Sequence, residues 1–430
     1  MSMFGSAGVV LVVMVAAYAG VRFFTKYTEI CMLAAALAGA AAGGHFFPVR
    51  HVAEGAATYL DINLIFLSAT LFMNILSASG GIAFAVRRIL ARFHRHRAAL
   101  LVFLALLLLV PGALTGAGSV TVLITGGMVA TVLECMGIPK IRVAAIVFLV
   151  AGLSAAAPPV SLWAMLTAAG VNMPYVGFFL PLLVPCVGLA VVTIFLLGWK
   201  GKPADLEQAL AGLPKPPAQM SWLRIALPFA VFFGLIFIGR QWPHSTPVVG
   251  LPLMFLCAAT VSLLASPLRV DLWRTSRDTV EQLLPLMATL TCAGILVQIM
   301  TLTGARGLMA VTVVTLPAFV VFATLFLVLP VSEAVLMYGA APVLGVPLVL
   351  LFNTMGLNPI VALAGMSLIW PLGDALPPTA IIGRLAVTTV GYEGAYGRFL
   401  KTCTLPAVII MIVGTLMVVF SRKLAFLTGL

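Results

Sequence analysis

Apolar positions dominate the chain and run in stretches long enough to cross a lipid bilayer. A membrane-spanning helix needs about 20 consecutive apolar residues. By this criterion, spans are predicted at residues 3–21, 28–47, 56–80, 143–170, 175–198, 221–239, 246–266, 279–303, 360–388 and 403–420. The expected fold class is therefore an all-α polytopic membrane protein.

Two further apolar stretches carry polar residues at their centres. Residues 98–135 are interrupted by TGAGSVT at 115–121, and residues 308–350 by LPVSEA at 329–334. Irregular backbone is tolerated at membrane depth only where protein or water covers it. We interpret each stretch as a re-entrant hairpin, which enters the membrane and returns to the same side.

Two of the predicted spans contain paired prolines near their midpoints. Pro158 and Pro159 interrupt one span, and Pro377 and Pro378 interrupt another. A proline within a helix removes one backbone hydrogen bond and frees a carbonyl group. Paired prolines beside hydroxyl groups, behind a hairpin in both halves, favour a functional helix break over a structural kink.

These elements divide the chain into two matching halves. The polar segment 199–220 connects them and is predicted to be a cytoplasmic linker with a short amphipathic helix. The two copies are expected to enter the membrane from opposite sides, which defines an inverted repeat. The halves are residues 1–198, with hairpin 98–135 and broken helix 143–170, and residues 221–430, with hairpin 308–350 and broken helix 360–388.

Composition and charge support a membrane protein. The chain is 62% hydrophobic and only 8% charged, whereas soluble domains average about 25% charged residues. The net charge of +12 is interpreted as topology rather than nucleic-acid binding, because Lys and Arg mark cytoplasmic loops. With the N-terminus outside, most of the 24 Lys and Arg residues fall inside. Treating the first hairpin as a single span would largely remove this bias.

Other sequence features narrow the function. The N-terminus has no basic region before its apolar run, which argues against a signal peptide. The six cysteines have neither zinc nor disulfide spacing and are expected to be small packing residues. Motifs for ATP binding and hydrolysis are absent, so no enzymatic activity is expected. The basic segment RRILARFHRHR at 87–97 is expected to set orientation and to contact anionic membrane lipids.

The hairpin tips supply candidate ion ligands. Hydroxyl and freed carbonyl oxygens suit a small hard cation, although Ser and Thr also bond to their own helix. An acid inside the membrane is costly and is usually functional. Glu333 could therefore coordinate sodium, carry a proton or pair with an arginine. The predicted ion-binding residues are Gly118, Ser119, Thr121, Ser332 and Glu333.

The helix breaks supply candidate substrate ligands. Exposed N–H groups at half-helix N-termini suit a carboxylate. Asp374 belongs to this set, with an exposed helix end as the alternative interpretation. The predicted substrate-binding residues are Pro158, Pro159, Ser161, Asp374, Pro377, Pro378 and Thr379, with Asn74 and Asn353 as further candidates.

Five stretches carry a resemblance to a known family. They are FMNILSASGGIAFAVRRIL (72–90), GALTGAGSVTVLITGGMV (112–129), AAAPPVSLW (155–163), LPVSEAVLMYGAAPVLGVPLV (329–349) and LNPIVALAGMSLIWPLGDALPPTA (357–380). Their arrangement resembles the large membrane (DctM-type) subunit of TRAP (tripartite ATP-independent periplasmic) transporters, within the ion-transporter superfamily. The resemblance covers most of the chain.

The resemblance implies an elevator-type transporter in the bacterial inner membrane, with a periplasmic N-terminus. A mobile domain would carry an organic acid with Na+ as coupling ion, and no other cofactor is expected. A small four-helix membrane subunit would brace the scaffold, and a periplasmic substrate-binding protein would deliver the substrate. Two departures stand out: Val120 and Thr121 follow Ser119, and Ala380 follows Thr379 where the family often has glycine.

Two alternatives remain open at this stage. The first is a stand-alone ion-coupled carrier of organic anions from the same superfamily, working without a binding protein. The second is an ion channel or a membrane scaffold protein. A channel should leave a continuous polar stripe across the bilayer, whereas the sequence shows only two tips and two breaks.

Overall fold

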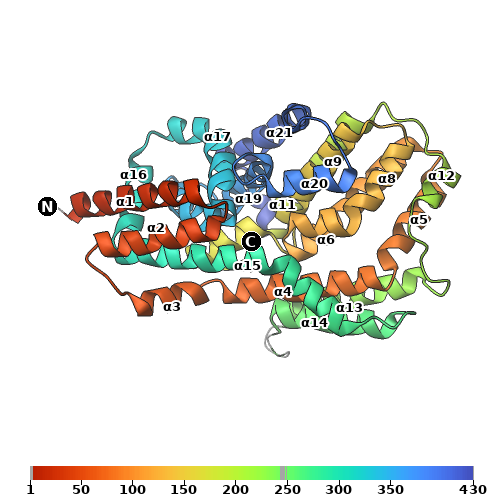
Figure 1. The fold of residues 1–430 in the computed structure, drawn as a ribbon, viewed down its shortest axis with the longest axis horizontal. Coiled ribbons are helices and arrows are strands. Elements are labelled where there is room, and N and C mark those ends of the chain that lie inside the picture. Colours follow the sequence, from red (N-terminus) through yellow and green to blue (C-terminus); the bar gives the residue numbers. More distant parts are fainter. Residues whose placement is uncertain (1–2, 243–246, 248, 430) are drawn as a thin grey trace.

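The computed structural model is described for residues 3–242, 247 and 249–429, and every regular element in these residues is helical (Figure 1). Within them, nine helices are long and apolar enough to cross a membrane. This confirms the all-α polytopic fold class. Two predicted spans are shorter than expected, because α2 (Thr28–Ala42) and α14 (Leu251–Ala265) have 15 residues each.

The helices form two groups. In the first, which we call the scaffold, α1 packs on α2, α4 on α14 and α15, and α13 on α14. Both α2 and α3 pack along α15, which runs below α2 in Figure 1. Besides α2 and α14, the scaffold contains α1 (Met3–Phe24), α3 (Val49–Ala57), α4 (Leu60–Ala78), α13 (Trp222–Gln241) and α15 (Leu272–Leu302).

The second group, which we call the core, is built around two helices that are buried on every side. Every residue of α9 from Val143 to Ala156 is buried, and so is every residue of α19 from Val361 to Ile369. A helix that is apolar all round belongs at the centre of a bundle. These two helices are α9 (Lys140–Ala156) and α19 (Pro359–Ile369).

Around them, the core contains α6 (Arg97–Thr115), α7 (Gly118–Thr121), a π-helical segment η1 (Val122–Gly126), α8 (Gly127–Cys135), α10 (Leu162–Gly170), α11 (Phe179–Gly198), α17 (Ala318–Leu336), η2 (Met337–Gly339), a second π-helical segment η3 (Ala341–Gly345), α18 (Val346–Thr354), η4 (Trp370–Ala375), α20 (Ile381–Val390) and α21 (Tyr396–Val419). Four shorter elements complete the chain: α5 (Gly81–Phe93), α12 (Leu206–Ala211), α16 (Ala305–Thr315) and η5 (Ala425–Thr428).

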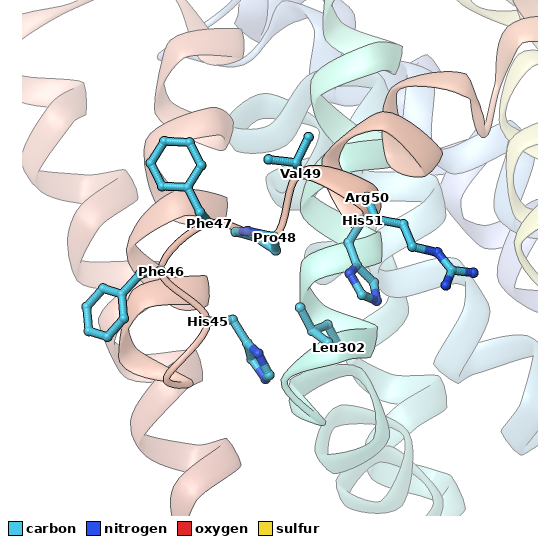
Figure 2. A pocket seen from close by; sticks show the side chains of 8 residues that line it. All are labelled: His45, Phe46, Phe47, Pro48, Val49, Arg50, His51 and Leu302. Carbon is cyan, nitrogen blue, oxygen red and sulfur yellow. The ribbon is translucent and has the colours of Figure 1, made fainter.

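The surface of the scaffold suits a lipid environment. Val12 and Val15 of α1 are 68% and 61% exposed, and Phe237 of α13 is 63% exposed. At the loop between α2 and α3, Phe46 and Phe47 point outward beside His45, Arg50 and His51, around a hollow of about 490 Å³ (Figure 2). Aromatic and basic side chains together are typical of a membrane–water boundary.

The two halves of the core repeat the same backbone features. The cis peptide Pro158–Pro159 recurs 219 positions later as Pro377–Pro378, and positive-φ Gly137 recurs as Gly356. The π-helical segments η1 and η3 are 219 positions apart as well. The contacts are reciprocal: α10 packs on η3, and α20 packs on η1. Reciprocal contacts are what a two-fold relation produces. Insertion from opposite sides of the membrane stays a prediction.

The first hairpin reverses at Gly116, whose φ of 66° closes α6. The second differs from its predicted limits. Residues 308–350 do not form one hairpin, because Pro317 ends α16 and the residue before a proline disfavours helix. Its tip is not at 329–334 either: α17 continues to Leu336, and the chain turns at Met337, with a φ of 52°. The Ser332 hydroxyl donates to its own helix at Leu329 O (2.7 Å), so this polar residue does not stop the helix.

Candidate functional site

The helix breaks and the hairpins meet inside the core. The break in the first half separates α9 from α10, and the break in the second separates η4 from α20. Each is bonded to the hairpin arm of its own half. The Val160 N–H donates to Ala113 O (3.0 Å), and Thr379 Oγ1 donates to Ala334 O (3.0 Å). Val160 and Thr379 are equivalent positions, but one donates through its backbone N–H and the other through its hydroxyl, and their acceptors are not equivalent.

Each break also reaches the hairpin tip of the other half. A methyl group at Gly118 would lie 3.0 Å from Ile382 Cδ1 and 2.8 Å from Ala151 O. The equivalent of Ile382 in the first half is Trp163, whose ring lies 6.5 Å from that of Tyr338, at the second tip. The absence of a side chain at Gly118 therefore allows this close approach between the halves.

A pair of buried acids lies at this meeting point. Glu333 of α17 is 0% exposed and Asp374 of η4 is 2% exposed, and α17 packs against η4. Gly373 makes this packing possible, because a methyl group there would lie 2.6 Å from Glu333 Cβ and 2.2 Å from Pro330 O. The sequence predicted both acids individually but assigned them to different ligands.

The two acids have no compensating partner among the described residues. Both carboxylate oxygens of Glu333 and Oδ2 of Asp374 are buried without a hydrogen bond. No described Lys or Arg forms an ion pair with either residue. The Trp163 indole N–H lies beside Glu333 but does not reach hydrogen-bonding geometry. Burying two charged carboxylates without a counter-charge is costly, so each carboxyl group needs a proton, a cation or another ligand to lower that cost.

Trp163 and Tyr338, which sequence reasoning missed, lie beside the acid pair, and Trp370, also missed, lies elsewhere in the core against Gly345. Trp163, Tyr338 and Trp370 are 0%, 7% and 0% exposed, and the indole N–H groups of both tryptophans are unpartnered among the described residues. Both tryptophans fall within the stretches that carry the family resemblance. Each tryptophan lies within a few residues of a proline pair, and this proximity could have marked it as a site residue. A buried indole N–H normally needs an acceptor.

The equivalent region of the first half carries hydroxyl groups. Thr121 Oγ1 and Ser154 Oγ are 2.8 Å apart, and the Ser154 hydroxyl lies 2.6 Å from Ala151 O as a donor. Ser119 is half-buried, and its hydroxyl has no hydrogen bond to another described residue. The Ser161 hydroxyl is buried and unpartnered in the described chain, while its N–H donates to the Tyr175 hydroxyl (3.3 Å).

The prolines of the breaks lie toward open space. Pro158 and Pro159 line a cleft of about 720 Å³ between the first break and α13–α14, which also contains Arg240. Pro377 and Pro378 are exposed. The second break is therefore exposed at the surface of the core, whereas at the first break Pro158 is buried and Pro159 half-buried beside the cleft.

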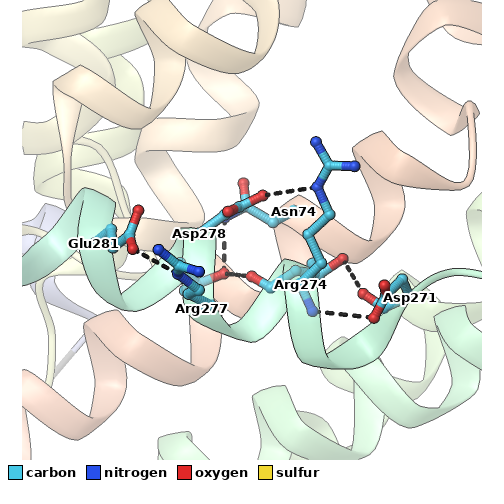
Figure 3. Close-up of polar contacts among 8 residues, drawn as sticks. Asn74, Asp271, Arg274, Arg277, Asp278 and Glu281 are labelled. Carbon is cyan, nitrogen blue, oxygen red and sulfur yellow. Dashed lines mark hydrogen bonds and ion pairs between the residues drawn. The ribbon is translucent and has the colours of Figure 1, made fainter.

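Three predicted site residues lie elsewhere. Ser332 lines a separate apolar cavity of about 400 Å³ between α17 and the scaffold. Asn74 donates to Thr279 Oγ1 (2.9 Å) and Gln282 Oε1 (3.2 Å) of α15, within the scaffold. Figure 3 shows Asn74 together with charged residues of the first part of α15. Asn353 is exposed near the end of α18. The structure does not bring these three together with the acid pair.

Comparisons with known proteins bear on the fold. No protein-family model matches the chain, and no curated protein matches it by sequence. The structure is similar to the YdaH transporter of Alcanivorax borkumensis, with a TM-score of 0.61, 13% identity and coverage of 88% of both chains.

It is also similar to MtrF of Neisseria gonorrhoeae, described as illuminating a class of antimetabolite efflux pumps. Here the TM-score is 0.60 with 13% identity, covering 88% of this chain and 84% of that one. At such low identity the likeness shows the fold alone. The protein is thus a multi-pass membrane protein with a fold found in membrane transporters, and the likeness does not single out the TRAP family.

Proposed function

We propose that the protein is a secondary-active transporter that takes up an organic acid together with sodium. The observation that carries this proposal is the buried pair Glu333 and Asp374, which has no counter-charge among the described residues and lies where two hairpins and two broken helices meet. Helix breaks at such a meeting point are the usual location of coupling-ion and substrate sites in secondary transporters.

The acid pair accounts for ion coupling. Carboxylate oxygens are hard ligands, as a small cation such as sodium prefers. A cation between Glu333 and Asp374 would reduce the buried negative charge and thus the cost of moving this region past lipid. The first tip, with Gly118, Ser119 and Thr121, offers backbone and hydroxyl oxygens for a second ion.

The breaks account for an acidic substrate. Helices α10 and α20 begin directly after the breaks, and neither has a side-chain cap at its N-terminus. Unpaired N–H groups and the positive end of the helix dipole attract a carboxylate. Arg240 faces the first break across its cleft and supplies a positive charge on the approach. Transport would then move the core against the scaffold, as in an elevator mechanism.

The proposed partners follow from the family resemblance. A small four-helix membrane subunit would cover part of the exposed apolar surface of the scaffold, and a periplasmic binding protein would deliver the acid at the inner membrane. A stand-alone carrier of the same superfamily is the alternative. The low identity to known structures favours neither arrangement.

Reconstitution in proteoliposomes tests the proposal. Uptake of a panel of labelled organic acids would be measured with a sodium gradient, with a proton gradient and with neither, in the presence and absence of the proposed partners. We expect uptake that requires the sodium gradient and the binding protein. Uptake without the binding protein would support the stand-alone carrier, and no gradient-driven uptake of any acid would contradict the proposed function.

A further inference from the structure

A basic cleft of about 500 Å³ lies between α5, α6 and α13, away from the acid pair. Arg88 and Arg92 line it, and their spacing of four residues places them on one side of α5. Phe93 stacks on Phe103 of α6 at 4.4 Å. These rings line the cleft together with Trp222, so it combines positive charge with an apolar wall.

Aromatic contacts hold the cleft open in a fixed shape. The Phe93–Phe103 stack joins α5 to α6, and the edge contact between Phe84 and Trp222, at 5.5 Å, joins α5 to α13. The Arg88 guanidinium lies 5.2 Å from the Phe84 ring centroid, which restricts its position. A site that exists before its ligand arrives loses less entropy on binding.

The arginines of segment 87–97 divide into two kinds. Arg87 donates to Leu210 O (2.7 Å) and Leu213 O (3.0 Å), and Arg97 donates to Trp199 O (3.3 Å). These two hold the linker between the halves. The side chains of Arg88 and Arg92, by contrast, make no hydrogen bond or ion pair with any residue in the described part of the chain. Their charge is available to a ligand.

We infer that this cleft binds an anionic phospholipid. The phosphate would lie between Arg88 and Arg92, and the part of the acyl chains nearest the headgroup would lie against Phe103 and Trp222. Arginine forms strong, directional bonds to phosphate. A free phosphate ion would leave the aromatic wall unused, whereas a lipid uses both parts of the cleft. The first turns of α6 and α13 form the cleft, and the charge distribution predicts the cytoplasmic side, where anionic lipids attract basic segments.

Thermal unfolding of the full-length protein in neutral detergent tests this inference. Phosphatidylglycerol, phosphatidylcholine or inorganic phosphate would be added to the wild type, to the double variant Arg88→Gln/Arg92→Gln and to Arg95→Gln as the matched control. We expect phosphatidylglycerol alone to raise the Tm of the wild type. The increase should disappear in the double variant and persist in Arg95→Gln, because Arg95 does not line the cleft.

Native mass spectrometry gives a second readout. It counts the phosphatidylglycerol molecules that each variant retains. If the double variant does not fold, the single variants Arg88→Gln and Arg92→Gln are measured in its place. We expect Arg88→Gln and Arg92→Gln each to retain less lipid than Arg95→Gln. An equal Tm increase with phosphatidylcholine or inorganic phosphate, or full lipid retention by the cleft variants, would overturn the inference.

Discussion

The two helix breaks share a backbone and differ in their chemistry. Near the second break lie the buried acids Glu333 and Asp374. Three of their four carboxyl oxygens have no hydrogen-bond partner among the described residues. Counting back the 219 positions that separate the proline pairs, the equivalent residues of the first half are Leu114 and Ala155. The repeat thus preserves the fold and not the charge, so the proposed ion coupling would rest mainly on the second half.

Two hydroxyl groups of the first half bond to each other instead. Ser154 and Thr121 bond to each other, and the Ser154 hydroxyl donates to Ala151 O. The position equivalent to Ser154 in the second half is Gly373, which brings η4 against α17. A hydroxyl in one half and a missing side chain in the other therefore occupy the same place.

The largest expected effect comes from Glu333→Gln. This change removes a charge that a bound cation needs, while it keeps the shape of the side chain. We expect kcat/KM for ion-coupled uptake to fall by about 100-fold or more, with no loss of Tm, because an uncompensated buried charge is itself destabilising. Uptake in proteoliposomes measures kcat/KM, and thermal unfolding measures Tm. Wild-type uptake by Glu333→Gln would remove the acid pair from the mechanism.

Gly373→Ala tests the packing that places the acids together. The added methyl group would lie 2.2 Å from Pro330 O, so η4 must move away from α17. We expect a loss of stability of about 1–3 kcal/mol and a clear loss of uptake. Ser154→Gly, at the equivalent position of the first half, is the matched control. It should retain more stability and more uptake than Gly373→Ala. If Gly373→Ala and Ser154→Gly reduced stability and uptake equally, the difference between the two helix breaks would have no role in transport.

A smaller effect is expected for Trp163→Phe. The indole N–H of Trp163 has no acceptor in the described chain and lies beside Glu333, so it can orient that carboxylate when an ion is bound. We expect ion affinity to weaken by about 10-fold, measured from the sodium dependence of uptake. Trp370→Phe controls for the loss of an indole N–H elsewhere in the core. A change in maximal rate at unchanged sodium affinity would contradict this role.

The smallest effect is expected for Ser154→Ala. The change removes a hydrogen-bonded hydroxyl pair and should cost about 1 kcal/mol of stability. Uptake should stay within about 3-fold of the wild type, a change in activation free energy below 1 kcal/mol. A loss of uptake as large as that of Glu333→Gln would show that the first break also binds the coupling ion.

Features that depend on local sequence were predictable. Apolar length indicated the membrane-spanning helices, and the proline pairs marked both breaks. The chain turns at Gly116, within the polar stretch 115–121, because Gly116 can adopt the left-handed backbone that closes α6. Glu333 stood out because an acid inside an apolar stretch is rare. Each of these signals lies within a few residues of the feature that it predicts.

Features that depend on packing across the fold were not predictable. That Asp374 lies near Glu333 follows from the contact of Gly373 with α17, which no local pattern encodes. Asn74 and Asn353 looked like polar residues in apolar helices, yet one bonds within the scaffold and the other is exposed. The second tip lies later than predicted because α17 accommodates Pro330 and continues to Leu336.

The reciprocal packing of the halves has a consequence for leakage. Thr167 of α10 donates to Ala341 O of η3 (3.2 Å), and α20 packs on η1. Neither repeat can shift without carrying part of the other with it. An ion held in one half and a substrate held in the other would therefore travel as one load. Under the proposed function, such an interlock would remove one route of leakage, in which one half moves with its ion while the other half stays behind.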